Sequence, residues 1–235
     1  MRLESMSPRT GFLFSMVFPA DDLLSEWTAT LALAFNDLSL VHARMEEDHG
    51  TPHKYFYWLR LAIAHFYEGA KFLDETSTIP EVAAFVAQLS PEARGQFEAC
   101  MSRYRERATP TFRLRNQVAF HYPRLAPGRT NRPVRKVLES LAPEIGQFDS
   151  GGTGKIRDAR MLFADDVTSE FFVQASGGHE ALAAVHSDIE AGIGSFMKFT
   201  NAALDAWFFQ AQERGAKFFN FEEGPFPWPQ MNEPD

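Results

Sequence analysis

Residues 51–74 read TPHKYFYWLRLAIAHFYEGAKFLD and give the strongest helical signal in the chain. Pro52 suits the first turn of a helix, where its missing N–H needs no partner. Apolar side chains then recur at intervals of three and four residues, as on the buried face of an amphipathic helix. They are Tyr55, Leu59, Ile63, Phe66 or Tyr67, and Leu73. The segment therefore predicts a long helix, ending near Asp74, that packs against other helices.

Helix start signals flank this segment on both sides. They are Asp21 or Asp22, the pair Thr78 and Glu81 with the spacing of a capping box, and Ser90 followed by Pro91. A further long helix is predicted over about residues 179–217, with the apolar face of a core or dimer helix. By contrast, the apolar and aromatic runs near residues 156–175 favour a small extended or hairpin insertion.

The composition indicates one packed all-α domain over residues 1–235. The chain is 45% hydrophobic and contains 23 Phe, which is typical of a folded globular protein. Its only cysteine, Cys100, excludes an intrachain disulfide and a cysteine-based zinc site, and it is expected to be buried and inert. These features favour a reducing cytoplasmic compartment.

The two ends of the chain carry further signals. Residues 10–20 form a short apolar segment, but Asp21 and Asp22 follow at once, so we expect it to pack on the protein's own core. No stretch approaches the roughly 18 apolar residues that span a bilayer, so no membrane partner is expected. The proline-rich residues 222–235 are expected to be an extended tail.

A second decisive stretch, residues 110–122, is predicted to form a helix that Pro123 terminates. It contains Arg115, Asn116 and His121. An arginine supplies a permanent cation for a phosphate, an amide supplies a hydrogen-bond donor, and an imidazole exchanges a proton near neutral pH. These side chains suit phosphodiester chemistry without a metal or another cofactor.

The charge distribution also favours a localised anionic ligand. Residues 103–136 carry nine Arg and one Lys against the single acid Glu106, so this stretch has a charge of +9 and the rest −17, for a net charge of −8. A protein that coats nucleic acid nonspecifically is basic overall. One concentrated basic region therefore predicts contact with an anion at one place, although some of these arginines could instead pair with acids inside the fold.

An arginine, a polar residue and a histidine after four to six intervening positions, on a helix of an all-α chain, resemble the HEPN superfamily. Five residues separate Arg115 from His121. The phrase RNQVAFHYP over residues 115–123 is similar to the motif of HEPN-type abortive-infection and toxin proteins, and residues 61–73 are similar to the helix that precedes it. The resemblance implies a HEPN-like helical bundle, a motif beside a dimer interface, and RNA cleavage without a metal.

Helical geometry bears on how such a site is assembled. At about 100° per residue, six steps leave Arg115 and His121 about 120° apart around the helix. Either Arg115 curls round on its long side chain, or a homodimer presents both pairs to one groove, as the resemblance implies. We therefore expect a metal-independent endoribonuclease of a toxin or antiviral-defence type, with RNA as substrate and an antitoxin or regulatory protein as a further possible partner.

Each predicted site residue has an expected role. His121 would be the general acid or base, Arg115 would stabilise negative charge, and Asn116 would orient the phosphate or the imidazole. Tyr122 would stack on a base. Contacts to the RNA backbone are expected from Arg113, Arg124, Arg129 and Arg132.

Alternatives remain open for these residues. Glu68 is expected to support the site or to contact the substrate, but Arg115 could instead simply bridge to Glu68. The chain could also be a noncatalytic HEPN-like dimerisation or protein-interaction module, with Arg115 and His121 at the interface. His65 with Glu68, and His186 with Glu190, have spacings at which a carboxylate–histidine metal site can be imagined. The repeated Glu-x-x-His motif of such sites is missing, so no metal is expected.

Overall fold

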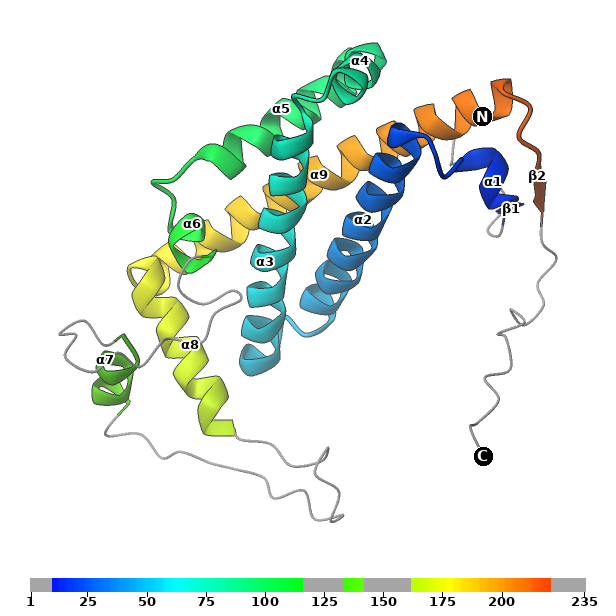
Figure 1. The fold of residues 1–235 in the computed structure, drawn as a ribbon. Helices are drawn as coiled ribbons and strands as arrows, with labels where there is room; N and C mark the ends of the chain where they lie inside the picture. Colours follow the sequence, from blue (N-terminus) through cyan, green and yellow to red (C-terminus); the bar gives the residue numbers. More distant parts are fainter. Residues whose placement is uncertain (1–9, 116–132, 142–161, 221–235) are drawn as a thin grey trace, which may run out of the picture.

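The computed structural model describes residues 10–115, 133–141 and 162–220 (Figure 1). This part of the chain is predominantly helical, which confirms the all-α class. Its helices are α1 (Phe14–Val17), α2 (Leu23–Glu47), α3 (Pro52–Thr76), α4 (Pro80–Gln88), α5 (Pro91–Arg105), α6 (Pro110–Leu114), α7 (Pro133–Ser140), α8 (Leu162–Ser176) and α9 (His179–Glu213). Two short strands, β1 (Thr10–Phe12) and β2 (Phe218–Asn220), pair antiparallel, with Gly11 opposite Phe219.

The core lies where α9 crosses the other long helices. Helices α2 and α3 lie side by side, and α9 packs on both of them and on α5 (Figure 1). Large side chains from these helices are fully buried between them, including Leu31, Leu38, Leu59, Ile63, Phe66, Phe196, Phe199 and Trp207. The predicted helix over residues 51–74 is confirmed, and it supplies the middle of this core.

Two glycines let α3 and α9 approach closely. A Cβ on Gly192 of α9 would lie 2.9 Å from the Phe66 ring of α3, and one on Gly69 of α3 would lie 3.0 Å from the Phe196 ring of α9. Each helix therefore presents a phenylalanine to a glycine of the other. This reciprocal packing holds the two helices at a fixed crossing point, since buried rings have little room to move.

The start signals in the sequence have mixed outcomes. The Asp22 carboxylate accepts from the Leu24 N–H, and the Ser90 hydroxyl accepts from the Ala93 N–H, each at 3.1 Å, so both predicted caps are confirmed. The capping box at Thr78 is wrong, because Ile79 occupies the N-cap position without a side-chain cap. Pro80 sets this start, since the residue before a proline is disfavoured in the helical conformation.

Helix α8 corrects the prediction of an extended insertion near residues 156–175. Residues 162–176 are helical, and Phe172 is fully buried. Gly177, at a φ of 103°, ends the helix, and the Gly178 N–H donates to the Val173 carbonyl at 2.8 Å. Packing of the aromatic residues therefore outweighs their local preference for strands. Helix α7 was not predicted, and residues 142–161 lie outside the described part.

The two ends of the helical body largely match the predictions. Val17 in the N-terminal apolar segment is fully buried, and its carbonyl accepts from the Trp207 indole N–H at 3.1 Å. Helix α9 ends at Glu213 rather than near residue 217, because Gly215 adopts a φ of 94°. The predicted tail over residues 222–235 lies outside the described part.

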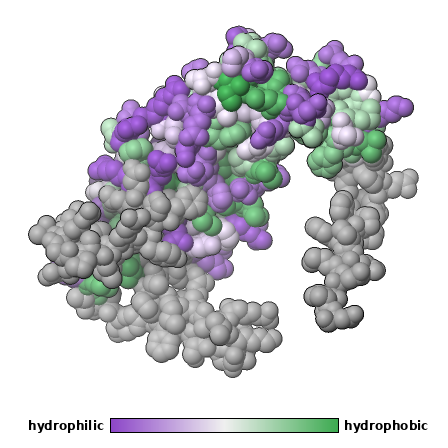
Figure 2. All heavy atoms as spheres, viewed as in Figure 1, coloured by the Kyte–Doolittle hydropathy of each residue, from purple (hydrophilic) through white to green (hydrophobic). Residues whose placement is uncertain are grey.

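The surface and the apolar faces bear on possible assembly. Ile189, Ile193 and Phe196, on the apolar face of α9, are fully buried within this chain, so that face belongs to the core and is not a dimer surface. Hydrophilic residues cover most of the described helices in Figure 2, and hydrophobic patches interrupt them. Within the described residues, no helix is long and apolar enough to cross a membrane.

Candidate functional site

Arg115 lies directly after α6, a short helix with a well-defined start. The Thr109 hydroxyl accepts from the Phe112 N–H at 3.1 Å, and Pro110 occupies the first turn. The described part of the predicted motif helix ends at Arg115. The other predicted residues of this region lie outside it: Asn116, His121, Tyr122, Arg124, Arg129 and Arg132.

The Arg115 side chain is held by two neighbouring residues of α3. Its guanidinium carbon lies over the Tyr67 ring, 5.2 Å from the centroid, and its Nη2 atom lies 3.8 Å from Glu68 Oε1. The side chain is 26% exposed, whereas Tyr67 is buried. The ring therefore supports one side of the guanidinium, and part of the cation remains accessible to an anion from solvent.

Tyr67 supports the cation without neutralising it. Burial raises the pKa of Tyr67 to about 12, so the phenol stays protonated near neutral pH. The negative charge of Asp188 raises this pKa further, while a hydrogen bond with Thr109 and the charge of Arg115 oppose the shift. Among the described residues, the carboxylate nearest to Arg115 is that of Glu68, and at 3.8 Å it lies beyond hydrogen-bond distance.

Asp188 on α9 fixes the position of α6. The Thr111 hydroxyl donates to Asp188 Oδ2 at 2.7 Å, and the Thr111 side chain is almost completely buried. On α5, Arg103 Nε lies 3.7 Å from the other carboxylate oxygen of Asp188. One carboxylate therefore joins three helices beside the residues that carry Arg115.

The described arginines of the basic region divide into paired and unpaired ones. Arg105 is neutralised, because its Nε and Nη2 atoms both donate to Asp74 Oδ1, at 3.0 and 2.6 Å. Arg113, a predicted RNA contact, is exposed, and Arg107 is also exposed, with its guanidinium 6.0 Å from the Phe112 ring centroid. Neither has a carboxylate partner among residues 10–115, 133–141 and 162–220. Sequence reasoning had not singled out Arg107 from its run of charges.

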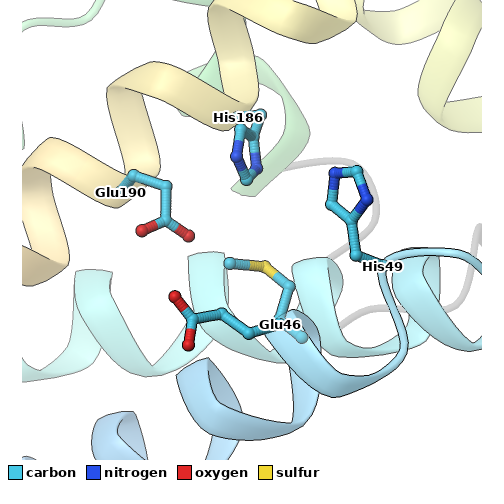
Figure 3. A pocket seen from close by; sticks show the side chains of 5 residues that line it. Glu46, His49, His186 and Glu190 are labelled. Carbon is cyan, nitrogen blue, oxygen red and sulfur yellow. The ribbon is translucent and has the colours of Figure 1, made fainter.

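A separate pocket lies between the end of α2 and α9. It has a volume of about 310 Å³ and is lined by Met45, Glu46, His49, His186 and Glu190 (Figure 3). Glu190 Oε2 lies 2.7 Å from the Nε2 atom of His42, and the Tyr55 hydroxyl lies 2.6 Å from His186 Nδ1. The sequence paired His186 with Glu190, but not with the residues that α2 contributes.

The described side chains give the metal alternative no support. His65 lies 3.7 Å from Asp37, and Glu68 lies 3.8 Å from Arg115. In the part of the chain that the structure describes, no three His, Cys, Asp or Glu side chains are arranged to hold a metal ion.

Cys100 is fully buried, as predicted. Burial raises the pKa of its thiol to about 12, so the reactive thiolate is not available near neutral pH.

Comparisons of the chain with protein-family models, curated proteins and solved structures gave no match.

Proposed function

We propose that this protein is a metal-independent endoribonuclease of a toxin or antiviral-defence type. The observation that carries the proposal is the setting of Arg115, a partly exposed cation supported by the ring of Tyr67. Arg107 and Arg113, which have no carboxylate partner among the described residues, supply further positive charge near α6. The sequence adds Asn116 and His121 within the next six residues.

In this proposal His121 accepts the proton of a ribose 2′-hydroxyl, and the resulting oxygen attacks the adjacent phosphorus. The P–O5′ bond breaks, the 5′ oxygen takes a proton, and a cyclic phosphate remains on the other fragment. Arg115 stabilises the additional negative charge on the phosphate, and Asn116 orients the phosphate or the imidazole. No metal takes part, and the basic residues hold the RNA backbone.

The test measures RNA cleavage in the presence of a chelator. Arg115→Ala and His121→Ala should each lower the rate by about 10²–10⁴-fold, the usual loss when an acid–base or charge-stabilising group is removed. Arg105→Ala is the matched control, because Asp74 already neutralises that guanidinium. Cleavage at the same rate by all three variants and the wild type would show that the site is assigned wrongly.

The proposed site is shared between two chains of a homodimer, because Arg115 and His121 diverge by about 120° around an ideal helix. An Arg115→Ala chain mixed with a His121→Ala chain should regain activity, since heterodimers carry one intact residue from each subunit. Activity should also fall on dilution below the dimer dissociation constant. No recovery, together with a dilution-independent specific activity, would restrict the proposal to a site within one chain.

A noncatalytic interaction module is the second candidate, and one contact favours it. The charge of Arg115 faces Glu68 at 3.8 Å, so part of its electrostatic interaction is already internal. Glu68→Gln separates the two candidates. It should strengthen RNA binding if Arg115 serves the phosphate, and it should leave RNA binding unchanged if Arg115 has only a structural role.

A further inference from the structure

The pocket between α2 and α9 faces away from Arg115. Asp188 and Glu190 are two residues apart on α9, so at about 100° per residue their side chains point to nearly opposite sides of the helix. Asp188 binds Thr111 on the side of α6, whereas Glu190 binds His42 and lines the pocket. Any ligand of the pocket would therefore occupy a site distinct from the proposed nuclease site, and the argument for it is independent of that proposal.

The lining of the pocket is rich in hydrogen-bond acceptors. Glu46 is exposed and has no cationic partner among the described residues, and Glu190 uses only Oε2 in its bond with His42. The Nδ1 atom of His186 is hydrogen-bonded to the Tyr55 hydroxyl, so a ligand could meet only its Nε2 atom. The four labelled side chains in Figure 3 converge on one space from two helices and the turn after α2. Carboxylates only accept hydrogen bonds, so a ligand that engages both of them must supply several donors.

The spacing of these groups suits an organic cation better than a metal ion. Zinc ligands lie about 2.0–2.2 Å from one point, which places their donor atoms close together. No three of the described His, Cys, Asp and Glu side chains form a group that could hold a metal ion. An ammonium group instead binds acceptors about 2.7–3.2 Å from its nitrogen, which allows a wider spread.

The shape of the pocket selects among organic cations. Its volume of about 310 Å³ is at the lower end for ligand pockets, so the ligand is small. The planar donors of a guanidinium suit one carboxylate approached edge-on, whereas the three donors of an ammonium suit acceptors from different directions. Met45, which is almost completely buried, adds an apolar surface for methylene groups.

We propose that this pocket binds a short alkylammonium cation, with Glu46 and Glu190 accepting its hydrogen bonds and neutralising its charge. The same chemistry is presented by a free aliphatic diamine and by a lysine side chain of a partner protein. Two probes distinguish these sources: putrescine, and a lysine that is acetylated at its amino end and amidated at its carboxyl end.

The experiment is isothermal titration calorimetry of the full chain at neutral pH and low salt with each probe. We expect binding of one molecule per chain, and the probe that binds more tightly identifies the source of the ammonium group. Glu46→Gln and Glu190→Gln should each weaken binding at least about tenfold, because each removes a charged acceptor. Of the two variants, Glu46→Gln is the decisive test of binding. The exposed Glu46 carboxylate makes no ion pair with a described residue, so its replacement should leave the fold unchanged.

Glu81→Gln is the matched control, because it changes the net charge equally from the exposed surface of α4. The affinity of the Glu81→Gln variant for each amine probe should equal that of the wild type. An equal loss in all three variants would reduce the effect to general attraction by an acidic protein and overturn the proposal. Zinc chloride alone is titrated in parallel. Stoichiometric zinc binding that excludes both amine probes would make the pocket a metal site and would overturn the proposal.

Discussion

Asp188 and Glu190 occupy the same helix, α9, and have opposite surroundings. Asp188 faces Arg103 and the buried hydroxyl of Thr111, close to the arginines of α5 and α6. Glu190 faces His42 and a pocket with a second carboxylate, Glu46. The two sides of one helix therefore present an environment that favours anions and one that favours cations.

The comparison shows how a protein with a net charge of −8 can present exposed positive charge at one place. On the Asp188 side, the carboxylate contacts are internal and leave exposed arginines such as Arg107 and Arg113 free of acidic partners among the described residues. On the Glu190 side, Glu190 Oε1 and the Glu46 carboxylate have no partner among the described residues. Helix α9 separates these environments, so its fixed position on α3 is a condition for both.

The largest expected effect comes from breaking that fixed position. Phe66→Ala should lower the free energy of unfolding by about 3–5 kcal/mol, because it removes a buried ring and leaves a cavity over Gly192. Phe14→Ala is the control, since that ring is 73% exposed and its loss should change stability by no more than about 0.5 kcal/mol. Urea denaturation measures both values.

A double-mutant cycle sharpens this test. Gly192→Ala alone adds a Cβ 2.9 Å from the Phe66 ring, whereas in a Phe66→Ala background the same Cβ has room. The two changes should therefore couple by about 0.5–3 kcal/mol, with the second alanine better tolerated after the first. Additive losses would mean that α9 does not depend on this crossing point.

The next effect compares the two carboxylates directly. Asp188→Ala should destabilise the protein by about 1–3 kcal/mol, because the buried Thr111 hydroxyl loses its acceptor. Glu190→Ala should cost at most about 1 kcal/mol, since the side chains of Glu190 and His42 are 29% and 26% exposed and solvent screens their interaction. Thermal and urea unfolding at neutral pH measure the difference. Equal losses would contradict the assignment of Asp188 as the structural carboxylate.

A smaller effect is expected in the salt dependence of RNA binding. Arg107→Ala combined with Arg113→Ala should lower the logarithmic salt slope for single-stranded RNA by roughly 1.4, about 0.7 for each lost phosphate contact. Glu46→Gln, on the other side of α9, should leave the slope unchanged. If the slope is the same in wild type and in the double variant, these arginines do not contact the RNA backbone.

Local signals account for the part of the fold that the sequence predicted. Asp22 and Ser90 cap their helices through atoms only two or three residues away, and the apolar spacing of residues 51–74 reports one continuous buried face. Helix α8 was missed because Phe171, Phe172 and Val173 favour strands locally, while the surrounding helices bury them in a helical conformation. A Gly-Gly pair at residues 177–178 was the signal for its end.

The sites were predictable to a smaller extent. The approach of Glu68 to Arg115 was anticipated as one alternative, but the stacking of Arg115 on Tyr67 was not. The pocket could not be anticipated, because His42 and Glu190 are 148 residues apart in sequence and meet only when α9 crosses α2. Spacing along one helix gives residues that share a face, and it carries no information on which other helix that face will meet.

The last expected effect is confined to alkaline pH and concerns one tyrosine on each side of α9. Burial raises the pKa of Tyr67 and of Tyr55 to about 12, and the negative charge of the nearby α9 carboxylate raises each further, Asp188 for Tyr67 and Glu190 for Tyr55. An unfolded tyrosine has a pKa of about 10. Between these values the unfolded chain releases its phenol protons and the folded chain keeps them, so stability falls as the pH rises from about 10 to about 12 and is unaffected below that range.

Tyr67→Phe and Tyr55→Phe should each weaken this alkaline loss, because phenylalanine has no proton to release. The measurements are urea denaturation at several pH values and the ultraviolet absorbance of tyrosinate in the folded protein. The comparison between the two sides predicts similar effects, since burial is the main cause in both places. A folded-state pKa near 10 for Tyr67, with Tyr55 near 12, would mean that the Arg115 side is more open to water than the pocket side. The ring of Tyr67 would then give Arg115 weaker support, and the proposed nuclease site would lose the observation that carries it.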